Sequence, residues 1–405
     1  MRVVVVVIAA VVLGAFLEAA SPPQSPNAAR ASAPRAETTR ETPLSPEQLK
    51  TAIDRLGTID YEARTSAARA LRRAPIATVA PALVDAVSRH ADGYVRFRAL
   101  VLLSGMNEPR THDVMVQALS SPNDRLRAAA YAYFEHNLDP QLVPRMLDAL
   151  STESSETVRP ALTRTLAAYA ADPRVRDALT GLVLKGQDFF RSAVIEAIGD
   201  YHGAYALPSL IQVAKLDGPL QDDAVLAIGK IGDKKSLEIL AALQRTAPRG
   251  VQPTIATAIC LLGVNCSSHQ SYLEKSLKFS METDGYRDLL HGSTRGLAAL
   301  AIAGNAEALS LLIGYGGPSR DPGRAAIALA LGAVALRNTP LFLKVLQAQA
   351  DPKPGIALLG ESFDMLEEDL EEERFYVAVR RGYWAAPENA PARKIAETLI
   401  QTLDF

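Results

Sequence analysis

The sequence predicts an all-α solenoid in which antiparallel helix pairs stack along one axis. Ala and Leu are abundant while aromatic residues make up only 6% of the chain, a balance that suits closely packed helices better than a β-sandwich or barrel. Apolar residues recur at helical spacing in segments that return about every 32 residues. Such an array also explains how 405 residues can share one continuous core, because its core grows along one axis.

Residues 1–20 have the layout of a secretory signal peptide. Arg2 supplies a positive start, residues 3–17 form an unbroken run of apolar residues and glycine, and the small residues Ala19 and Ala20 follow. The run is short for a membrane-spanning helix, and an uncleaved N-terminal anchor is the alternative. We therefore expect an exported protein, periplasmic or in the cell envelope, that is either released or tethered to the membrane.

Residues 21–45 are predicted to be a disordered linker. The segment is rich in Pro, Ala, Ser and Thr and almost lacks the large apolar residues whose burial would offset the entropy lost on ordering. The first helix should begin directly after it. Ser45 can act as the N-cap, Pro46 suits the first helical position, and Gln48 can complete a capping box.

The repeat is defined by a series of anchor residues, each of which opens an amphipathic helix. Successive anchors are 32, 31, 32, 32 and 30 residues apart. Apolar residues stand three and seven positions after every anchor, and these offsets lie on one face of a helix. The anchors are Arg64, Arg96, Arg127, Arg159, Arg191 and Gln221.

A second helix is expected at a fixed phase after each anchor. Residues nineteen positions on are apolar, and proline recurs seventeen positions after three anchors, at Pro81, Pro144 and Pro208. Proline fits the first turn of a helix, where its missing N–H costs nothing. Three prolines at one phase indicate that one structural unit was copied.

Glycine is expected to end the first helix of several units. Gly105, Gly199 and Gly229 lie eight or nine residues after their anchors, where a left-handed C-cap would precede the reversal into the second helix. This spacing predicts a turn at each of the three glycines.

Later repeats are less regular. The glycine rule applied to Gly263, Gly304 and Gly332 predicts units that open near Ile255, Gly296 and Arg324. The longest step contains residues 279–292, which we interpret as an inserted loop or extra turn. In total we expect about 9–10 repeats over residues 46–348, followed by capping helices with an acidic segment over residues 349–405.

The motif of each unit resembles the HEAT family, and in particular the short HEAT-like repeats of the phycobilin-lyase type. It consists of an acid, two residues, an arginine, an alanine-rich helix, a glycine turn and a leucine-rich helix. The resemblance extends over about residues 61–346. It implies a binding scaffold and says little about enzymatic activity. The matching segments are 124–127, 156–159, 188–191, 196–200 and 227–233.

The recurring acid and arginine permit two interpretations. One is a charged binding groove. The resemblance favours the other, in which the acid caps a turn and the arginines form a ladder between repeats. An acid at the start of a helix also satisfies free N–H groups and the helix dipole. The ladder residues would be Arg64, Arg96, Arg127, Arg159, Arg191 and Arg324.

No pattern for catalysis, cofactor binding or metal binding stands out. None of the six histidines has a second histidine four positions on, and none is followed by Glu. Di-iron hydroxylases built from HEAT-like repeats rely on repeated His-Glu pairs, so that activity is not implied here. A phosphate-binding loop and a nucleophile elbow are also missing from the sequence. We therefore expect no enzymatic activity, no cofactor and no metal.

The two cysteines, Cys260 and Cys266, leave two interpretations open. In an oxidising compartment they could close a small disulfide loop. Alternatively, Cys260 is a small core residue and Cys266 lies in a loop. Spacing alone does not decide between them, because disulfide formation depends on geometry.

Charge argues against nucleic acid as a partner. The formal net charge is −2, and residues 51–180 contain 16 Arg and no Lys against 15 acidic residues. A nucleic-acid-binding surface needs a basic excess to neutralise phosphates. We infer that these arginines are offset by the acids around them.

The C-terminal region has a different charge pattern. Residues 361–373 contain eight acids and no base, and an aromatic group follows. One interpretation is a capping repeat with a polar outer face. The other is an end that binds a protein partner through charge and aromatic anchors. The candidate binding residues are Glu367, Glu368, Glu371, Glu372, Tyr376, Tyr383 and Trp384.

These observations favour a non-catalytic scaffold or adaptor that binds protein partners in the cell envelope. Two alternatives remain. One is an enzyme or cofactor-handling protein of the HEAT-like lyase or hydroxylase type, and the other is a membrane-tethered structural component. Contact with the membrane is expected only through an uncleaved N-terminal anchor.

Overall fold

The computed structural model describes residues 42–366 and 368–405. These residues form 22 α-helices with four short 3₁₀ segments and no strand, so the predicted all-α solenoid is confirmed. The predicted signal segment and most of the predicted linker lie outside the described residues. Within that part of the chain, no single helix is long and apolar enough to span a membrane. α18 (Gly323–Arg337) and α19 (Thr339–Ala348) reach that length and apolar composition only when they are taken together, and the chain bends sharply between them.

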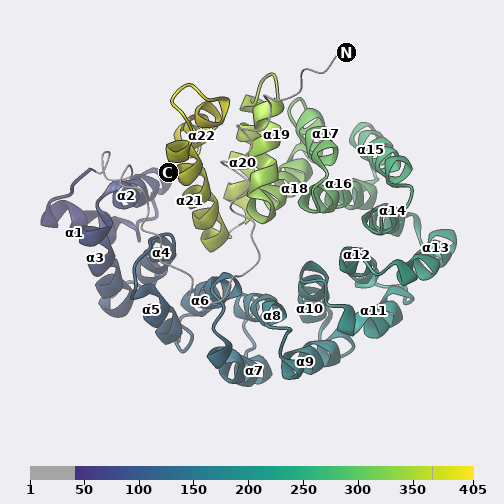
Figure 1. Cartoon of the computed structure of the whole chain (residues 1–405), viewed down its shortest axis with the longest axis horizontal. Coiled ribbons are helices and arrows are strands. Elements are labelled where there is room, and N and C mark those ends of the chain that lie inside the picture. Colours follow the sequence, from purple (N-terminus) through teal and green to yellow (C-terminus); the bar gives the residue numbers. More distant parts are fainter. Residues whose placement is uncertain (1–41, 367) are drawn as a thin grey trace, which may run out of the picture.

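The helices form two concentric layers that curve into a ring (Figure 1). Nine helix pairs follow one another around it, each with an inner and an outer member. The inner helices are α2 (Tyr61–Arg73), α4 (Gly93–Ser104), α6 (Asp124–His136), α8 (Val158–Ala168), α10 (Asp188–Asp200), α12 (Gln221–Ile231), α14 (Gln252–Leu261), α16 (Arg287–Ile302) and α18. The outer helices are α3 (Ile76–Arg89), α5 (Thr111–Ala118), α7 (Val143–Thr152), α9 (Pro173–Val183), α11 (Leu207–Ala214), α13 (Leu237–Thr246), α15 (Cys266–Glu282), α17 (Ala306–Gly316) and α19.

Four more helices complete the ends. α1 (Pro46–Arg55) packs on α2, and α20 (Lys353–Leu366) continues the inner layer beyond α18. α21 (Asp369–Ala385) and α22 (Pro391–Thr402) pack on each other. α21 also contacts α18 on one side and α4 and α6 on the other, so it lies between the two ends of the solenoid (Figure 1).

The anchor pattern defines the core. The residues three and seven positions after the six anchors, from Ala67 and Leu71 to Ala224 and Ile228, are all buried. The Ser45 capping box at the start of α1 is present, with the Gln48 N–H donating to the Ser45 hydroxyl and the Ser45 N–H donating to the Gln48 side chain. These local signals therefore set the helix starts and the inward face as expected.

Two of the three repeated prolines lie where the sequence predicts. Pro144 and Pro208 occupy the first turn of α7 and α11. The prediction is wrong for Pro81, which lies inside α3 because that helix already begins at Ile76.

The glycine interpretation is correct at Gly263 and Gly304, which follow α14 and α16 with positive φ values of 78° and 107°, and wrong at Gly332, which lies within α18. It is also wrong for the early repeats. Gly105 has right-handed helical backbone angles, and Gly199 and Gly229 lie within α10 and α12. A Cβ on Gly199 would lie 2.8 Å from the Ala227 Cα, and one on Gly229 would lie 2.5 Å from the Ala258 Cα. These glycines therefore allow neighbouring inner helices to approach closely, which any larger residue would prevent.

The region read as an insertion is helical. Residues 279–292 comprise the end of α15, a short turn and the start of α16. α15 and α16 are 17 and 16 residues long, whereas most earlier helices have 8–14, so the extra residues lengthen the outer helix of one pair and the inner helix of the next. α14 and α18 begin near Ile255 and Arg324 as predicted, but α16 begins nine residues before Gly296.

The buried apolar residues form two clusters that meet at α14. The first runs from Leu49 to Leu262, and the second from Ala256 to Phe405. Among the described residues, Leu370 is the one member of the first cluster that follows residue 262. The C-terminal end of the solenoid thus enters the N-terminal core at a single apolar point.

Candidate functional site

The anchor arginines contact the helix that precedes them. Each donates a hydrogen bond to a backbone carbonyl at the end of the previous helix or in the turn after it, where carbonyls have no partner inside that helix. The acceptors are Thr58 and Ile59 for Arg64, Val87 for Arg96, Ser121 for Arg127, Glu153 for Arg159, Val183 for Arg191, and Gly316 and Gly317 for Arg324.

This contact also explains the glutamine in the series. The Gln221 side-chain amide donates to the Ala214 carbonyl at 3.0 Å, as the arginines do at their positions. Acids support some anchors, because Asp124 and Asp188 pair with Arg127 and Arg191 at 2.8 and 2.9 Å. The anchor side chains therefore join successive helix pairs and do not form a free charged groove.

Cys260 and Cys266 are joined as a disulfide. Their Cα atoms are 4.2 Å apart, across the turn from α14 to α15. Gly263 and Asn265 in that turn have positive φ values of 78° and 44°. The left-handed backbone turns the chain back within six residues and brings the two side chains together.

The ring is closed by α21, and we call its contacts with α2, α4 and α6 the closure seam. Arg72 of α2 donates to Glu373 through Nε and Nη2 at 2.9 and 2.6 Å, and the two side chains are only 11% and 3% exposed. Arg98 of α4 pairs with Asp369. Cations of two successive inner helices thus bind acids on one helix of the opposite end.

A third pair involves α6. His136 Nε2 lies 2.7 Å from Glu371 Oε1, and Arg374 pairs with the same carboxylate at 2.6 Å. Burial alone would raise the pKa of Glu371, but its hydrogen bond to His136 and the charges of His136, Arg374 and Arg337 outweigh burial. The pKa of Glu371 is therefore lowered to about 2, and the carboxylate stays charged.

Leu370 is the apolar centre of the closure seam. It is 5% exposed and belongs to the N-terminal core cluster. Its neighbours in the sequence, Asp369 and Glu371, form ion pairs with Arg98 and His136. Gly105 at the end of α4 makes room beside it, because a Cβ there would lie 2.7 Å from the Glu373 carboxylate and 3.1 Å from Val377. The seam therefore combines one buried leucine, a close backbone approach and several ion pairs.

A cavity of about 410 Å³ remains at the closure seam, lined on one side by α2 and α4 and on the other by α20 and α21. Glu372 lines it and forms no ion pair with the described residues. Burial, followed by the charge of Asp369, raises the pKa of Glu372 to about 8, although Arg98 opposes the shift. The seam is thus incompletely filled and contains one carboxyl that is largely neutral at pH 7.

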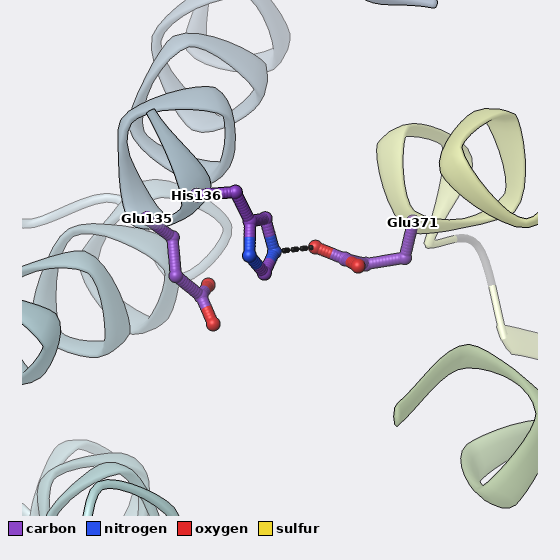
Figure 2. A group of neighbouring side chains, drawn as sticks. All are labelled: Glu135, His136 and Glu371. Carbon is purple, nitrogen blue, oxygen red and sulfur yellow. Dashed lines mark hydrogen bonds and ion pairs between the residues drawn. The ribbon is translucent and has the colours of Figure 1, made fainter. Parts of the chain in front are cut away.

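Glu135, His136 and Glu371 could together offer a metal ion three ligand atoms, which lie within 4.8 Å of one another (Figure 2). Each donor already has partners, however. Glu135 forms an ion pair with Arg164 at 2.8 Å and accepts a hydrogen bond from Tyr201 at 2.7 Å, and Arg374 contacts both remaining members of the cluster. A metal would have to displace two guanidinium groups, so the donors fit an ion-pair network better than a metal site.

That network continues along the inner wall. Arg164 of α8 joins Glu135 of α6 to Asp200 of α10, and Lys230 of α12 joins the same aspartate at 2.5 Å. Charges thus alternate across four successive inner helices. Each carboxylate is only 3–20% exposed and has a cation beside it, as buried charges require.

The family comparison is consistent with this architecture. A family model of HEAT repeats matches residues 49–135 and 112–199. The chain contains HEAT repeats. The matched segments include α1 to α10, where the HEAT-type anchor spacing is most regular.

The comparison with solved structures finds similarities at low sequence identity. YibA of Escherichia coli is 18% identical, with 54% of this chain and 82% of that chain aligned and a TM-score of 0.40. The CpcE–CpcF complex of phycocyanin lyase from Nostoc is 16% identical, with 64% and 97% aligned and a TM-score of 0.41. The karyopherin Kap121p, bound to the C-terminus of the phosphatase Cdc14p, is 12% identical, with 88% and 50% aligned and a TM-score of 0.44. A comparison with curated proteins finds no match.

The predicted partner-binding residues make contacts within the chain. Glu367 lies outside the described residues. Glu368 pairs with Arg337 at 2.7 Å, and Glu371 and Glu372 lie in the closure seam. The Tyr376 ring stacks on Phe405, while Tyr383 and Trp384 pack together beside Arg393.

Sequence reasoning missed the closure of the ring. The signal was present as an acidic run without bases at residues 361–373 and an arginine-rich, lysine-free region at residues 51–180. It also missed the Glu135–His136 pair, because the search was for His followed by Glu.

Proposed function

We propose that this HEAT solenoid is exported and acts as a non-catalytic scaffold that binds protein partners in the cell envelope. A HEAT-repeat solenoid is consistent with such a scaffold. The observation that carries the proposal is an apolar rim on one edge of the ring.

The apolar rim consists of the turns that lead into an inner helix from the helix before it, together with the helix ends that flank each turn. Because all inner helices run in the same direction, these turns lie on the same edge of the solenoid. Several of the large exposed apolar side chains are found there, although water disfavours such groupings. They are Ile59, Tyr61, Leu184, Phe189, Leu216, Phe279 and Tyr286.

Two neighbouring turns give the rim its strongest section. Phe189 and Leu216 are 56% and 61% exposed, on the turns that enter α10 and α12, and Leu184 is 43% exposed beside them. Aromatic and aliphatic side chains in such a position supply the apolar anchors of protein interfaces. We infer that a partner covers this section of the apolar rim.

The proposal is tested by capture of partners from envelope fractions with the purified full chain. Phe189→Ser combined with Leu216→Ser should reduce recovery of a specific partner at least ten-fold. Ile76→Ser is the matched control, because Ile76 is also exposed (39%) but starts an outer helix on the opposite edge. Equal recovery with the double variant, or no partner above background under mild conditions, would refute the apolar rim as the binding surface.

Export is tested separately by fractionation and N-terminal sequencing of the natural protein. A start near Ser21 would support a released protein, and retention of residues 1–20 in a membrane fraction would support the tethered alternative. A soluble intracellular protein with an intact N-terminus would contradict export. Metal analysis and an absorption spectrum address the lyase or hydroxylase alternative, since a metal or chromophore at unit stoichiometry would support it.

A further inference from the structure

We propose that the surface beneath α21, formed by α2, α4 and α6, is a docking site for an acidic helix of a partner protein, and that α21 is its internal occupant. The inference rests on the proposed scaffold function but uses a different surface from the apolar rim. We call this surface the basic groove and define it by Arg72, Arg98, Arg125 and His136.

Charge complementarity identifies the ligand class. Arg72, Arg98 and His136 come from three successive inner helices and each meets an acid of α21. Arg125 lies over the rings of Tyr94 and Phe97 at the same wall, and the described residues provide it with no carboxylate partner. Glu372 of α21 lines the same cavity as Arg125, so four acids of α21 stand against the four groove cations. A helix that carries acids at this spacing would fit the groove.

The contacts of α21 define a recognition pattern. Leu370 enters the N-terminal core, and the acids at positions 369, 371 and 373 pair with the three groove cations. On a helix, these residues form a leucine framed by acids one position before it and one and three positions after it. A partner helix with this arrangement can use the same leucine pocket and the same cations.

Few apolar residues of α21 enter the N-terminal core. Phe375 and Val379 of α21 belong to the C-terminal cluster, while Leu370 alone belongs to the N-terminal one. Release of the groove would therefore break mainly polar contacts, including those of Arg69 and Arg73 with Asp404 and Phe405, while α21 stayed packed on α18, α20 and α22. The 410 Å³ cavity and the unpaired Glu372 indicate that α21 fills the groove imperfectly.

The test measures binding of a fluorescent peptide that copies residues 363–381 to the full chain. In the wild-type protein α21 competes with the peptide. Leu370→Asp in the protein should weaken this competitor while it leaves the groove unchanged, and peptide affinity should rise at least ten-fold. Met365→Asp is the matched control, because Met365 is 41% exposed on the adjacent α20 and its affinity should equal that of the wild type.

Specificity is tested within the opened protein. Arg98→Glu added to Leu370→Asp should lower peptide affinity at least ten-fold, and a peptide with Asp in place of its leucine should bind equally poorly. Glu373→Lys is a second opening variant in case Leu370→Asp folds poorly, as judged by circular dichroism. It breaks the contact with Arg72 from the α21 side.

Two results would overturn the proposal. One is the same peptide affinity in both opening variants as in the wild type, and the other is binding that does not depend on Arg98. Concentration-dependent dimerisation of the opened variants without peptide binding would assign the groove to a second copy of the chain and refute a separate partner. The rim variant Phe189→Ser with Leu216→Ser should leave peptide binding unchanged, so failure here is distinguishable from failure of the proposed scaffold function.

Discussion

Gly105→Ala tests the closure of the ring, because open and closed structures predict opposite signs for its effect. Gly105 has φ −80° and ψ −9°, values that alanine adopts without strain. At such a position replacement of glycine by alanine stabilises a protein by about 0.4–1 kcal/mol, through the entropy of the unfolded chain. In an open solenoid the variant should therefore be more stable than the wild type.

In the closed ring the new methyl group has no room. It would lie 2.7 Å from the Glu373 Oε1 atom, 2.9 Å from its Cγ and 3.1 Å from Val377. The Glu373 side chain cannot easily move, since it is 3% exposed and accepts hydrogen bonds from Arg72. Overpacking of this kind costs about 1–3 kcal/mol, so the net expectation is a destabilisation of roughly 1–2 kcal/mol.

The assay is urea denaturation followed by circular dichroism, with Gly181→Ala as the matched control. Gly181 lies within α9 and a Cβ there would meet nothing within 4 Å, so that variant should gain stability by up to about 1 kcal/mol. In a Glu373→Ala background, Gly105→Ala should lose most of its cost, because the clashing carboxylate is gone. A stabilised Gly105→Ala protein, or costs that add in the double variant, would refute the closure seam.

Three further predictions concern the charged residues. Glu372→Gln should stabilise the protein by roughly 1–3 kcal/mol at pH 9 and little at pH 5. The folded-state pKa of Glu372, about 8, exceeds the usual 4.5, so the free energy of unfolding of the wild type falls as the pH rises between these values. Thermal melts at several pH values will show whether this pH dependence is absent from the variant. Arg164→Met should cost about 3–5 kcal/mol in urea denaturation, because it leaves the buried Glu135 and the neighbouring Asp200 without their shared cation; a cost below 1 kcal/mol would argue against the inner-wall network. Arg191→Leu should cost about 1 kcal/mol through loss of its bond to the preceding helix, whereas Arg191→Gln, which copies the glutamine of another repeat, should cost less than half of that in the same assay.

Local signals in the sequence were reliable where a single repeat determines the outcome. The capping box at Ser45 and the buried positions three and seven residues after each anchor depend on neighbours within one helix pair or the next. The glycine interpretation held at Gly263 and Gly304 but failed at Gly199 and Gly229, because these two contact the adjacent inner helix and do not form a turn. The spacing of the sequence showed that glycine recurs at these positions. It did not show which neighbouring residue requires glycine there.

The candidate site shows the same division more sharply. The acidic residues 361–373 were visible, and so were the arginines of the first repeats. That Glu373 meets Arg72 and Asp369 meets Arg98, about 300 and 270 positions apart, could not be inferred from either segment. An acidic surface for an external partner and an acidic surface for the other end of the same chain have the same local pattern.

The sequence by itself determined the helix pair, its period and its inward face, because each depends on contacts within a repeat or between adjacent repeats. The tertiary structure alone decided that the solenoid closes on itself through Leu370 and the ion pairs around it. Each helix pair is rotated slightly relative to the one before it, and closure depends on the sum of these rotations over the nine pairs. Such a sum is set by packing details, such as the glycines between inner helices, that no single repeat reveals.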